Sequence, residues 1–294
     1  MTTVRRVLWV LLVAAAVVVA QDDPGDAVAP ARAAAEMGSA AAQFELGLMY
    51  DEGHGVPQDY SEAAKWYRKS ADQGNAAAQV NLGTLFHLGE GVPHDDVEAE
   101  KWYRKSAEQG DALAQIKLGA LYHFGEGVPQ DIGEALKWYR KAADQNDPDA
   151  EVILGLIYAK GQSVAQDYKE AAAWFRKAAE QGQADAEYHL GVLYGDGTGV
   201  LQNYKEAVRW LRKSARQENV AAFTKLGHLY ETGTGLAQNL VLADMWLSLA
   251  VSHTDGNAKQ AAAEARDAVA ARLTLKQIEE AEQLARDWKP SEEE

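Results

Sequence analysis

The sequence predicts an all-α protein, a right-handed α-solenoid built from stacked helical hairpins. Two regularities carry this prediction. A tryptophan recurs every 36 residues, and so does a Leu-Gly pair that begins at Leu46-Gly47 and returns in the same register six times in all. A fixed period of this length is typical of repeat proteins, in which each unit is one supersecondary element. The tryptophans are Trp66, Trp102, Trp138, Trp174, Trp210 and Trp246, and the later Leu-Gly pairs are Leu82-Gly83, Leu118-Gly119, Leu154-Gly155, Leu190-Gly191 and Leu226-Gly227.

The period divides the chain into four parts. We expect a signal peptide over residues 1–20 and a linker with an N-terminal capping helix over residues 21–39. Residues 256–294 are expected to form C-terminal capping helices and an acidic tail, with Thr274 and Gln277 as the capping box of the last helix. Between them lie six helix-turn-helix repeats, at 40–75, 76–111, 112–147, 148–183, 184–219 and 220–255.

Each repeat is expected to contain two helices. In the first repeat, Leu46 and Tyr50 belong to an apolar stripe with helical spacing, and Gly53 ends this first helix. Asp59 then begins the second helix, with Glu62 three residues later, the spacing of a capping box. Because one helical hairpin cannot bury its apolar face alone, neighbouring units must stack, and we expect each tryptophan to fill the gap between them. The capping-box pair recurs as Asp95/Glu98, Asp131/Glu134, Asp167/Glu170 and Asn203/Glu206.

The composition excludes several classes of function. The chain carries 29 Lys and Arg against 44 Asp and Glu, a net charge of −15, so we expect no nucleic-acid binding, which needs clustered positive charge. Hydrophobic residues make up 47% of the chain, enough to build a core. The sequence has no cysteine, which excludes disulfides, thiol nucleophiles and cysteine-ligated zinc or iron–sulfur centres.

The N-terminal residues have the pattern of a secretory signal peptide. Arg5 and Arg6 precede an unbroken apolar run from Val7 to Ala20, which is shorter than the roughly 20 residues that cross a bilayer. Val18 and Ala20 are the small residues expected before a cleavage site. We therefore expect a periplasmic or secreted bacterial protein without stable membrane insertion after cleavage; the alternative is an anchor formed by an uncleaved signal.

The repeat resembles the Sel-1-like repeat family, an offshoot of the tetratricopeptide repeat. The resemblance covers residues 40–255, and it implies an adaptor or scaffold that assembles other proteins. A cysteine-rich branch of the family is linked to β-lactam binding and hydrolysis, and it staples each hairpin with a disulfide that this chain lacks. The first repeat carries the family pattern through Ala42, Leu46, Gly47, Tyr50, Gly53, Gly55, Val56, Asp59, Tyr60, Ala63, Trp66, Tyr67, Lys69, Ala71, Gln73 and Gly74.

The motifs of an enzyme are missing from the sequence. No serine is followed three residues later by lysine, as a serine β-lactamase requires, and there is neither a G-x-S-x-G nor an H-E-x-x-H motif. His87 and His123 share one repeat position and form the only candidate metal pair, but neighbouring helices pack about 8–10 Å apart, too far for a shared zinc ion. We therefore predict no catalytic, cofactor or metal site.

The first helices supply the candidate binding residues. Positions that stay constant between repeats build the core, whereas positions that vary are free to face a ligand. The variable positions lie on one flank of each first helix, and in tetratricopeptide-like solenoids this flank lines the concave groove. The candidate groove residues are Glu45, Leu48, Asn81, Thr84, His87, Lys117, His123, His189, Lys225 and His228.

The sequence thus favours an exported, non-enzymatic scaffold that binds a peptide or protein segment in its groove. Two alternatives stay open. One is an envelope hydrolase directed at β-lactams or the cell wall, and the other is a periplasmic regulator that inhibits a sensor protein. A third interpretation of the candidate residues is a solvated face that contacts no partner.

Overall fold

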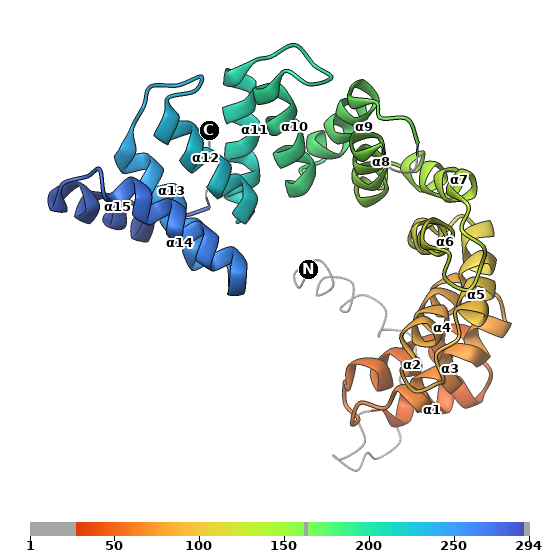
Figure 1. Ribbon diagram of the computed structural model, residues 1–294. Helices are drawn as coiled ribbons and strands as arrows, with labels where there is room; N and C mark the ends of the chain where they lie inside the picture. The colour runs from red at the N-terminus through yellow and green to blue at the C-terminus, as the bar shows by residue number, and fades with distance from the viewer. Residues whose placement is uncertain (1–27, 162–163, 291–294) are drawn as a thin grey trace. The chain divides into compact units, whose positions relative to one another are not determined.

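The structure is a computed structural model that describes residues 28–161 and 164–290. Within these residues it contains α-helices and no strand, which confirms the predicted all-α fold class (Figure 1). The predicted signal peptide lies outside the described residues. The helices are α1 (Ala29–Glu36), α2 (Ala40–Glu52), α3 (Tyr60–Asp72), α4 (Ala76–Leu88), α5 (Asp96–Glu108), α6 (Ala112–Phe124), α7 (Ile132–Ala143), α8 (Pro148–Lys160), α9 (Tyr168–Glu180), α10 (Ala184–Asp196), α11 (Tyr204–Arg216), α12 (Val220–Thr232), α13 (Leu240–Ser252), α14 (Gly256–Ala270) and α15 (Leu275–Asp287).

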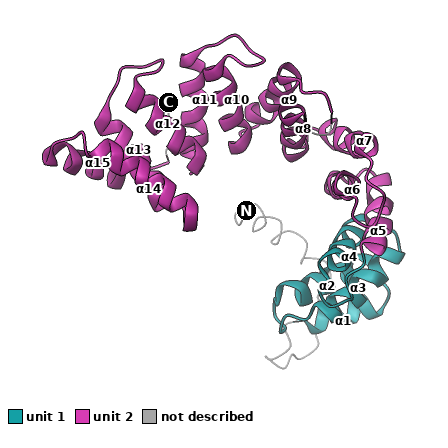
Figure 2. Ribbon diagram, in the orientation of Figure 1, with its two compact units in different colours: residues 1–95 teal, residues 96–294 magenta. Residues whose placement is uncertain are grey.

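The helices belong to two compact units, residues 1–95 and residues 96–294 (Figure 2). In the first unit, α1 to α4 each pack on the next helix in sequence. In the second unit the same holds from α5 to α14, and α15 returns to pack on α13. Packing of each helix on its neighbours in sequence is the arrangement of a solenoid, in which every repeat contacts mainly the repeats beside it. In the part of the chain that the structure describes, no helix has both the length and the apolar character to cross a bilayer.

The Leu-Gly pair is the place where the two helices of one repeat meet. In the fourth repeat, Leu154 on α8 is fully buried. A Cβ atom added to Gly155 would lie 2.6 Å from Cε1 of Phe175 on α9, closer than any real contact. Glycine at this position therefore lets the aromatic ring of the second helix lie directly on the backbone of the first. Gly47 and Gly119 meet Tyr67 and Tyr139 in the same way.

The repeat tryptophans pack against the preceding repeat, as predicted. Trp66 clusters with Val28 and Ala35, which belong to α1 and the residue before it. Trp210 clusters with Phe175 on α9. A lysine three residues later covers the ring, and Lys213 Nζ lies 4.6 Å from the centroid of Trp210. The first five repeat tryptophans each have such a lysine over the ring, whereas Leu249 takes its place beside Trp246.

The predicted capping boxes of the second helices form only in part. The side chain of Asp59 accepts hydrogen bonds from the backbone N–H groups of Ser61 and Glu62, as an N-cap should. The backbone N–H of Asp59, however, already donates to the carbonyl oxygen of Tyr50 at 2.8 Å. The N–H of Asp59 is therefore not free to donate to the Glu62 carboxylate, as a capping box requires. The carboxylate pairs with Lys65 at 2.6 Å instead. The last helix, α15, does form the complete box between Thr274 and Gln277.

The terminal helices reuse the contacts of the repeats. Arg32 on α1 donates to the hydroxyl of Tyr50 at 3.0 Å, a bond that Arg176 makes to Tyr194 in a later repeat. Helix α1 thus occupies the place of a second helix from an absent earlier repeat. At the other end, the ring of Trp288 stands edge-on to Phe223, with ring centroids 5.3 Å apart. Aromatic packing therefore fixes the end of α15 against α12.

Truncating a central tryptophan should be costly. Trp138 is only 5% exposed, so we expect Trp138→Ala to lower the free energy of unfolding by about 3–5 kcal/mol. Its indole Nε1 is buried and has no hydrogen-bond partner among the described residues. Trp138→Phe, which loses no hydrogen bond, should therefore cost clearly less than alanine. Urea unfolding followed by circular dichroism measures both, and a loss below about 1 kcal/mol for the alanine variant would contradict burial between repeats.

Alanine substitutions at two glycines with the same backbone conformation distinguish the cost of backbone strain from the cost of a steric clash. Gly182 and Gly199 both have a positive φ, but a Cβ on Gly182 meets nothing within 4 Å, whereas one on Gly199 would lie 2.2 Å from the carbonyl oxygen of Tyr168. We expect Gly182→Ala to cost roughly 1–2 kcal/mol of left-handed strain. Gly199→Ala should cost about 1–3 kcal/mol more, because the loop must move off the start of α9. Equal losses in urea unfolding would show that this loop contact contributes nothing.

Candidate partner-binding site

We call the predicted groove residues on the first helices the first-helix face. They lie on α2, α4, α6, α10 and α12. Glu45 and His228 are exposed and the other eight are partly buried, so each side chain is anchored at its base and accessible at its tip. The ten residues are Glu45, Leu48, Asn81, Thr84, His87, Lys117, His123, His189, Lys225 and His228.

The face is supported by an aromatic row on the second helices. Within the second unit, the ammonium of Lys117 lies 5.7 Å from the ring centroid of Tyr103. The ring of His189 stacks on Phe175, with centroids 4.8 Å apart and an interplanar angle of 18°. The variable side chains of the face are therefore positioned by a nearly constant layer beneath them.

Burial changes the protonation of two members of the face. It lowers the pKa of Lys117, because the ammonium loses hydration. It also lowers the pKa of His189 from its ordinary value of 6.5, and this effect outweighs the attraction of Asp185. His189 is therefore a neutral ring at pH 7, suited to stacking and hydrogen bonding rather than to charge pairing.

Two predicted residues meet in one hollow. Lys225 and His228 on α12 both line a cavity of about 460 Å³ that also reaches α10 and α11. Lys225 Nζ lies 3.8 Å from Asp196, and His228 Nδ1 lies 3.5 Å from Glu231. The polar rim surrounds a floor that includes Leu211, so the hollow offers both charge and apolar contact.

Two other predicted residues make contacts within their own repeat. The hydroxyl of Thr84 donates to the carbonyl oxygen of Val80 in the same helix at 3.0 Å. The ring of His123 packs beside Phe124, with centroids 4.8 Å apart. The functional role of the first-helix face as a whole stays a prediction.

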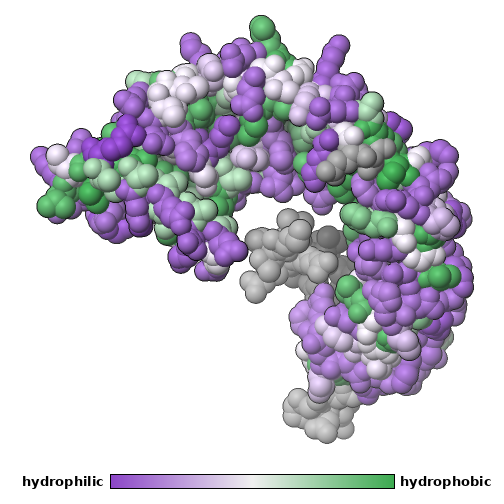
Figure 3. Space-filling model, viewed as in Figure 1, coloured by the Kyte–Doolittle hydropathy of each residue, from purple (hydrophilic) through white to green (hydrophobic). Residues whose placement is uncertain are grey.

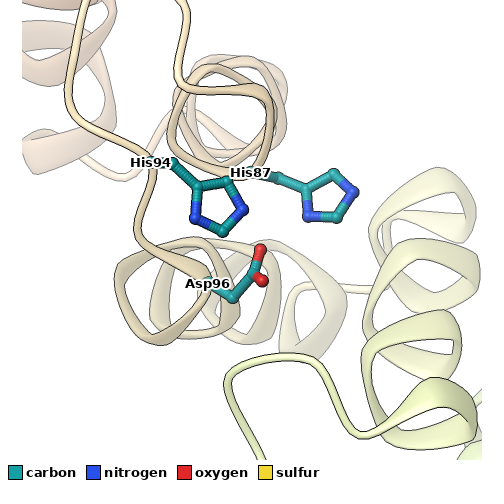
Figure 4. A group of neighbouring side chains, drawn as sticks. All are labelled: His87, His94 and Asp96. Carbon is teal, nitrogen blue, oxygen red and sulfur yellow. The ribbon is translucent and has the colours of Figure 1, made fainter.

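Sequence reasoning missed a neighbour of His87. Figure 4 shows His87 at the end of α4 and His94 in the loop that follows, with ring centroids 6.3 Å apart. Figure 4 also labels Asp96, the residue that begins helix α5 in the second unit. The sequence feature that could have revealed this neighbour is His94 itself, which stands where the other repeats have glutamine, as in Gln130.

Comparison with known proteins identifies the repeat. The Sel1 repeat family matches residues 40–75, 76–111, 112–147, 148–183, 184–219 and 222–255. This chain belongs to the Sel1 repeat family. Sel1 repeat proteins are generally scaffolds for protein interactions, and this match indicates no catalytic family. No curated protein matches the chain.

Two solved structures resemble this Sel1 repeat protein. A Sel1 repeat protein from Oxalobacter formigenes is 38% identical, with a TM-score of 0.69, over 74% of this chain and 89% of the other. A protective antigen from uropathogenic Escherichia coli strains is 29% identical, with a TM-score of 0.54, over 90% of this chain and 71% of the other. Both have the Sel1-like repeat fold, and the predicted family is confirmed.

A buried polar row runs under the first helices of the Sel1 repeats. Gln43 and Gln115 donate from Nε2 to backbone carbonyl oxygens of the preceding second helix, at 3.0 and 3.1 Å. Glu151 and Glu187 occupy the same repeat position and are 1% and 3% exposed. Each accepts a hydrogen bond from a glutamine, Gln181 for Glu151, but an ionised carboxylate cannot donate to the carbonyl that glutamine would satisfy. Burial accordingly raises the pKa of both acids.

Replacing these two acids by glutamine should stabilise the protein at neutral pH. A folded-state pKa above the unfolded value of about 4.5 adds stability below that value, which is lost as the pH rises through the folded pKa. We expect Glu151→Gln and Glu187→Gln each to gain about 1 kcal/mol at pH 7, with the gain shrinking toward pH 4. Urea unfolding at several pH values tests this, with the exposed Glu180→Gln as the control. A gain independent of pH would rule out titration as the cause.

Proposed function

We propose that this Sel1 repeat protein is a non-enzymatic scaffold that binds a peptide or protein segment on its first-helix face. The hollow that joins Lys225 and His228 carries the proposal, since two residues chosen from sequence variation alone line one cavity. Family membership supports the general role, because Sel1 repeat proteins bind protein partners. The groove and its occupant are our inference from the residues on the face.

The chemistry of the hollow suits a peptide. Leu229 supplies apolar contact, while Lys225 and Asp196 supply both signs of charge at the rim. Backbone amides and mixed side chains of a peptide match such a surface better than a uniformly charged ligand does. Apolar residues elsewhere on the visible face form only scattered patches in a mainly hydrophilic surface (Figure 3). A localised hollow is therefore a better candidate than a broad hydrophobic interface.

The alternatives gain no support from a particular residue. A hydrolase directed at β-lactams or the cell wall would need a nucleophile with an adjacent base, and the sequence has no such motif. A periplasmic regulator that inhibits a sensor protein would use the same face, and it differs from a general scaffold only in its partner. We therefore keep the scaffold as the proposal.

We further propose that the protein acts in the bacterial envelope. Arg5 and Arg6 before the apolar run Val7–Ala20 support export, with processing after Ala20. Export would place the scaffold among periplasmic or secreted partners. Mass spectrometry of the periplasmic protein tests this, because an N-terminus at Gln21 is expected after cleavage.

Removing the tips of the face should abolish partner binding. We expect a variant with Lys117→Ala, His189→Ala and Lys225→Ala to lose proteins that the chain from Gln21 retains from an envelope extract. These tips are partly exposed, so the variant should fold normally by circular dichroism. Mass spectrometry of the eluates measures the difference.

A matched control removes lysines from second helices instead. Lys137 and Lys169 are exposed and lie outside the first-helix face. Lys137→Ala with Lys169→Ala should leave the retained proteins unchanged. If the face variant retains the same partners as the unaltered chain, the groove assignment is wrong and binding must use another surface.

A further inference from the structure

Helix α11 differs in charge from the protein around it. The chain as a whole has a net charge of −15, yet α11 carries five basic residues and a single acid, Glu206. No feature of the first-helix face requires this charge, because the basic residues lie on the second helix of the fifth repeat. The five basic residues are Lys205, Arg209, Arg212, Lys213 and Arg216.

These cations share one hollow. A cavity of about 390 Å³ runs along α11 and is closed by Tyr230 on α12 and by the loop after it. All five basic residues line it, and none of its lining residues is acidic. Val208 and Leu236 also line the cavity, so it combines apolar contact with positive charge.

The first repeat contains the same hollow with a different charge. Its cavity of about 480 Å³ is lined by equivalent residues of α3 and of the loop after α4, and by Glu62 in addition. Ser61 occupies the repeat position of Lys205, and Asp72 occupies the repeat position of Arg216. The two members of each pair are 144 residues apart in the sequence. The position of Arg216 is acidic in all four earlier repeats, as Asp72, Glu108, Asp144 and Glu180. The fifth repeat thus keeps the hollow of the first repeat but reverses the charge at the end where Arg216 lies.

Few of the positive charges are neutralised by the protein itself. Arg209 pairs with Glu206 at 2.7 Å, and Arg212 donates to the hydroxyl of Tyr230 at 2.7 Å. From α10, Glu187 attracts Lys213 and Arg216, but its carboxylate is buried and already accepts a hydrogen bond from Gln217. Lys205, Lys213 and Arg216 form no ion pair within 4.0 Å in the described part of the chain. Lys205 and Arg216 are therefore available to a ligand, and Lys213 has only the ring of Trp210 beside its ammonium.

We propose that this hollow binds an extended acidic peptide segment of a partner protein. The span from Lys205 to Arg216 is eleven residues, or about 16 Å along the helix, which matches roughly five residues of extended chain. A single phosphate group would contact only one end of this row. The apolar lining gives a peptide side chain a place that a small anion cannot use. The proposal goes beyond the first-helix face and does not depend on it.

A defined probe tests the proposal. Fluorescence anisotropy of a labelled octapeptide with six glutamates and two leucines is measured against the chain from Gln21. We expect binding that weakens with added salt, because exposed charges are screened. Lys205→Ser with Arg216→Asp, which recreates the hollow of the first repeat, should weaken binding at least tenfold. The reverse change, Ser61→Lys with Asp72→Arg, should add a second site of similar affinity.

The controls separate position from net charge. Lys160→Asp with Lys169→Ser changes the net charge by the same amount at exposed residues outside this hollow, and it should leave the affinity unchanged. Equal weakening by this control, or equal binding of an octapeptide with lysine in place of glutamate, would overturn the proposal. Complete displacement by millimolar inorganic phosphate or by a short oligothymidine would also overturn it in favour of a phosphate site. The variant that lacks Lys117, His189 and Lys225 side chains should bind the probe normally, so failure of the first-helix face is distinguishable.

Discussion

The close approach of two helices at one glycine is the constraint on which the other features of the repeat depend. Because Gly155 has no Cβ, the ring of Phe175 lies against the backbone of α8, and Leu154 beside it is fully buried. This contact sets the rotation of the second helix about its axis. Trp174, one residue before Phe175, consequently faces the preceding repeat, where it packs on a cluster that includes Leu136. Packing within a repeat thus determines packing between repeats.

A fixed framework leaves function to the positions that vary. The position of the second helix that packs on this glycine is Tyr, Phe or Leu throughout, but the residue above it changes from Lys117 to His189 to Lys225. The same contrast holds on α11, where Arg212 keeps the position of Arg68 while Arg216 reverses the charge of Asp72. Because stability in a solenoid is mainly a sum of contacts between neighbours, such changes alter a surface without altering the fold.

The sequence predicted the helices and the core well, since both follow from a period that all repeats share. Features that depend on whether a backbone carbonyl or N–H is already hydrogen-bonded could not be predicted from the spacing of residues in the sequence. Asp59 and Glu62 have the spacing of a capping box, yet the box fails because Tyr50 already accepts the N–H of Asp59. The buried acid Glu151 was missed because Gln and Glu at one repeat position look like an exposed, variable site. The basic hollow on α11 could not be predicted, because its charge depends on two positions of one second helix, Lys205 and Arg216, that break no repeat pattern of the core.

The two candidate surfaces are held in a fixed relation by α11 itself. Leu211 lines the hollow that contains Lys225, while Arg212 and Lys213 line the basic hollow on another side of the helix. Trp210 and Leu211 are both buried, so α11 cannot rotate to favour one surface over the other. A partner whose acidic segment is joined to a segment for the first-helix face would meet both at a set separation. Its second contact would then be intramolecular, and weak individual sites would combine into firm binding through effective concentration.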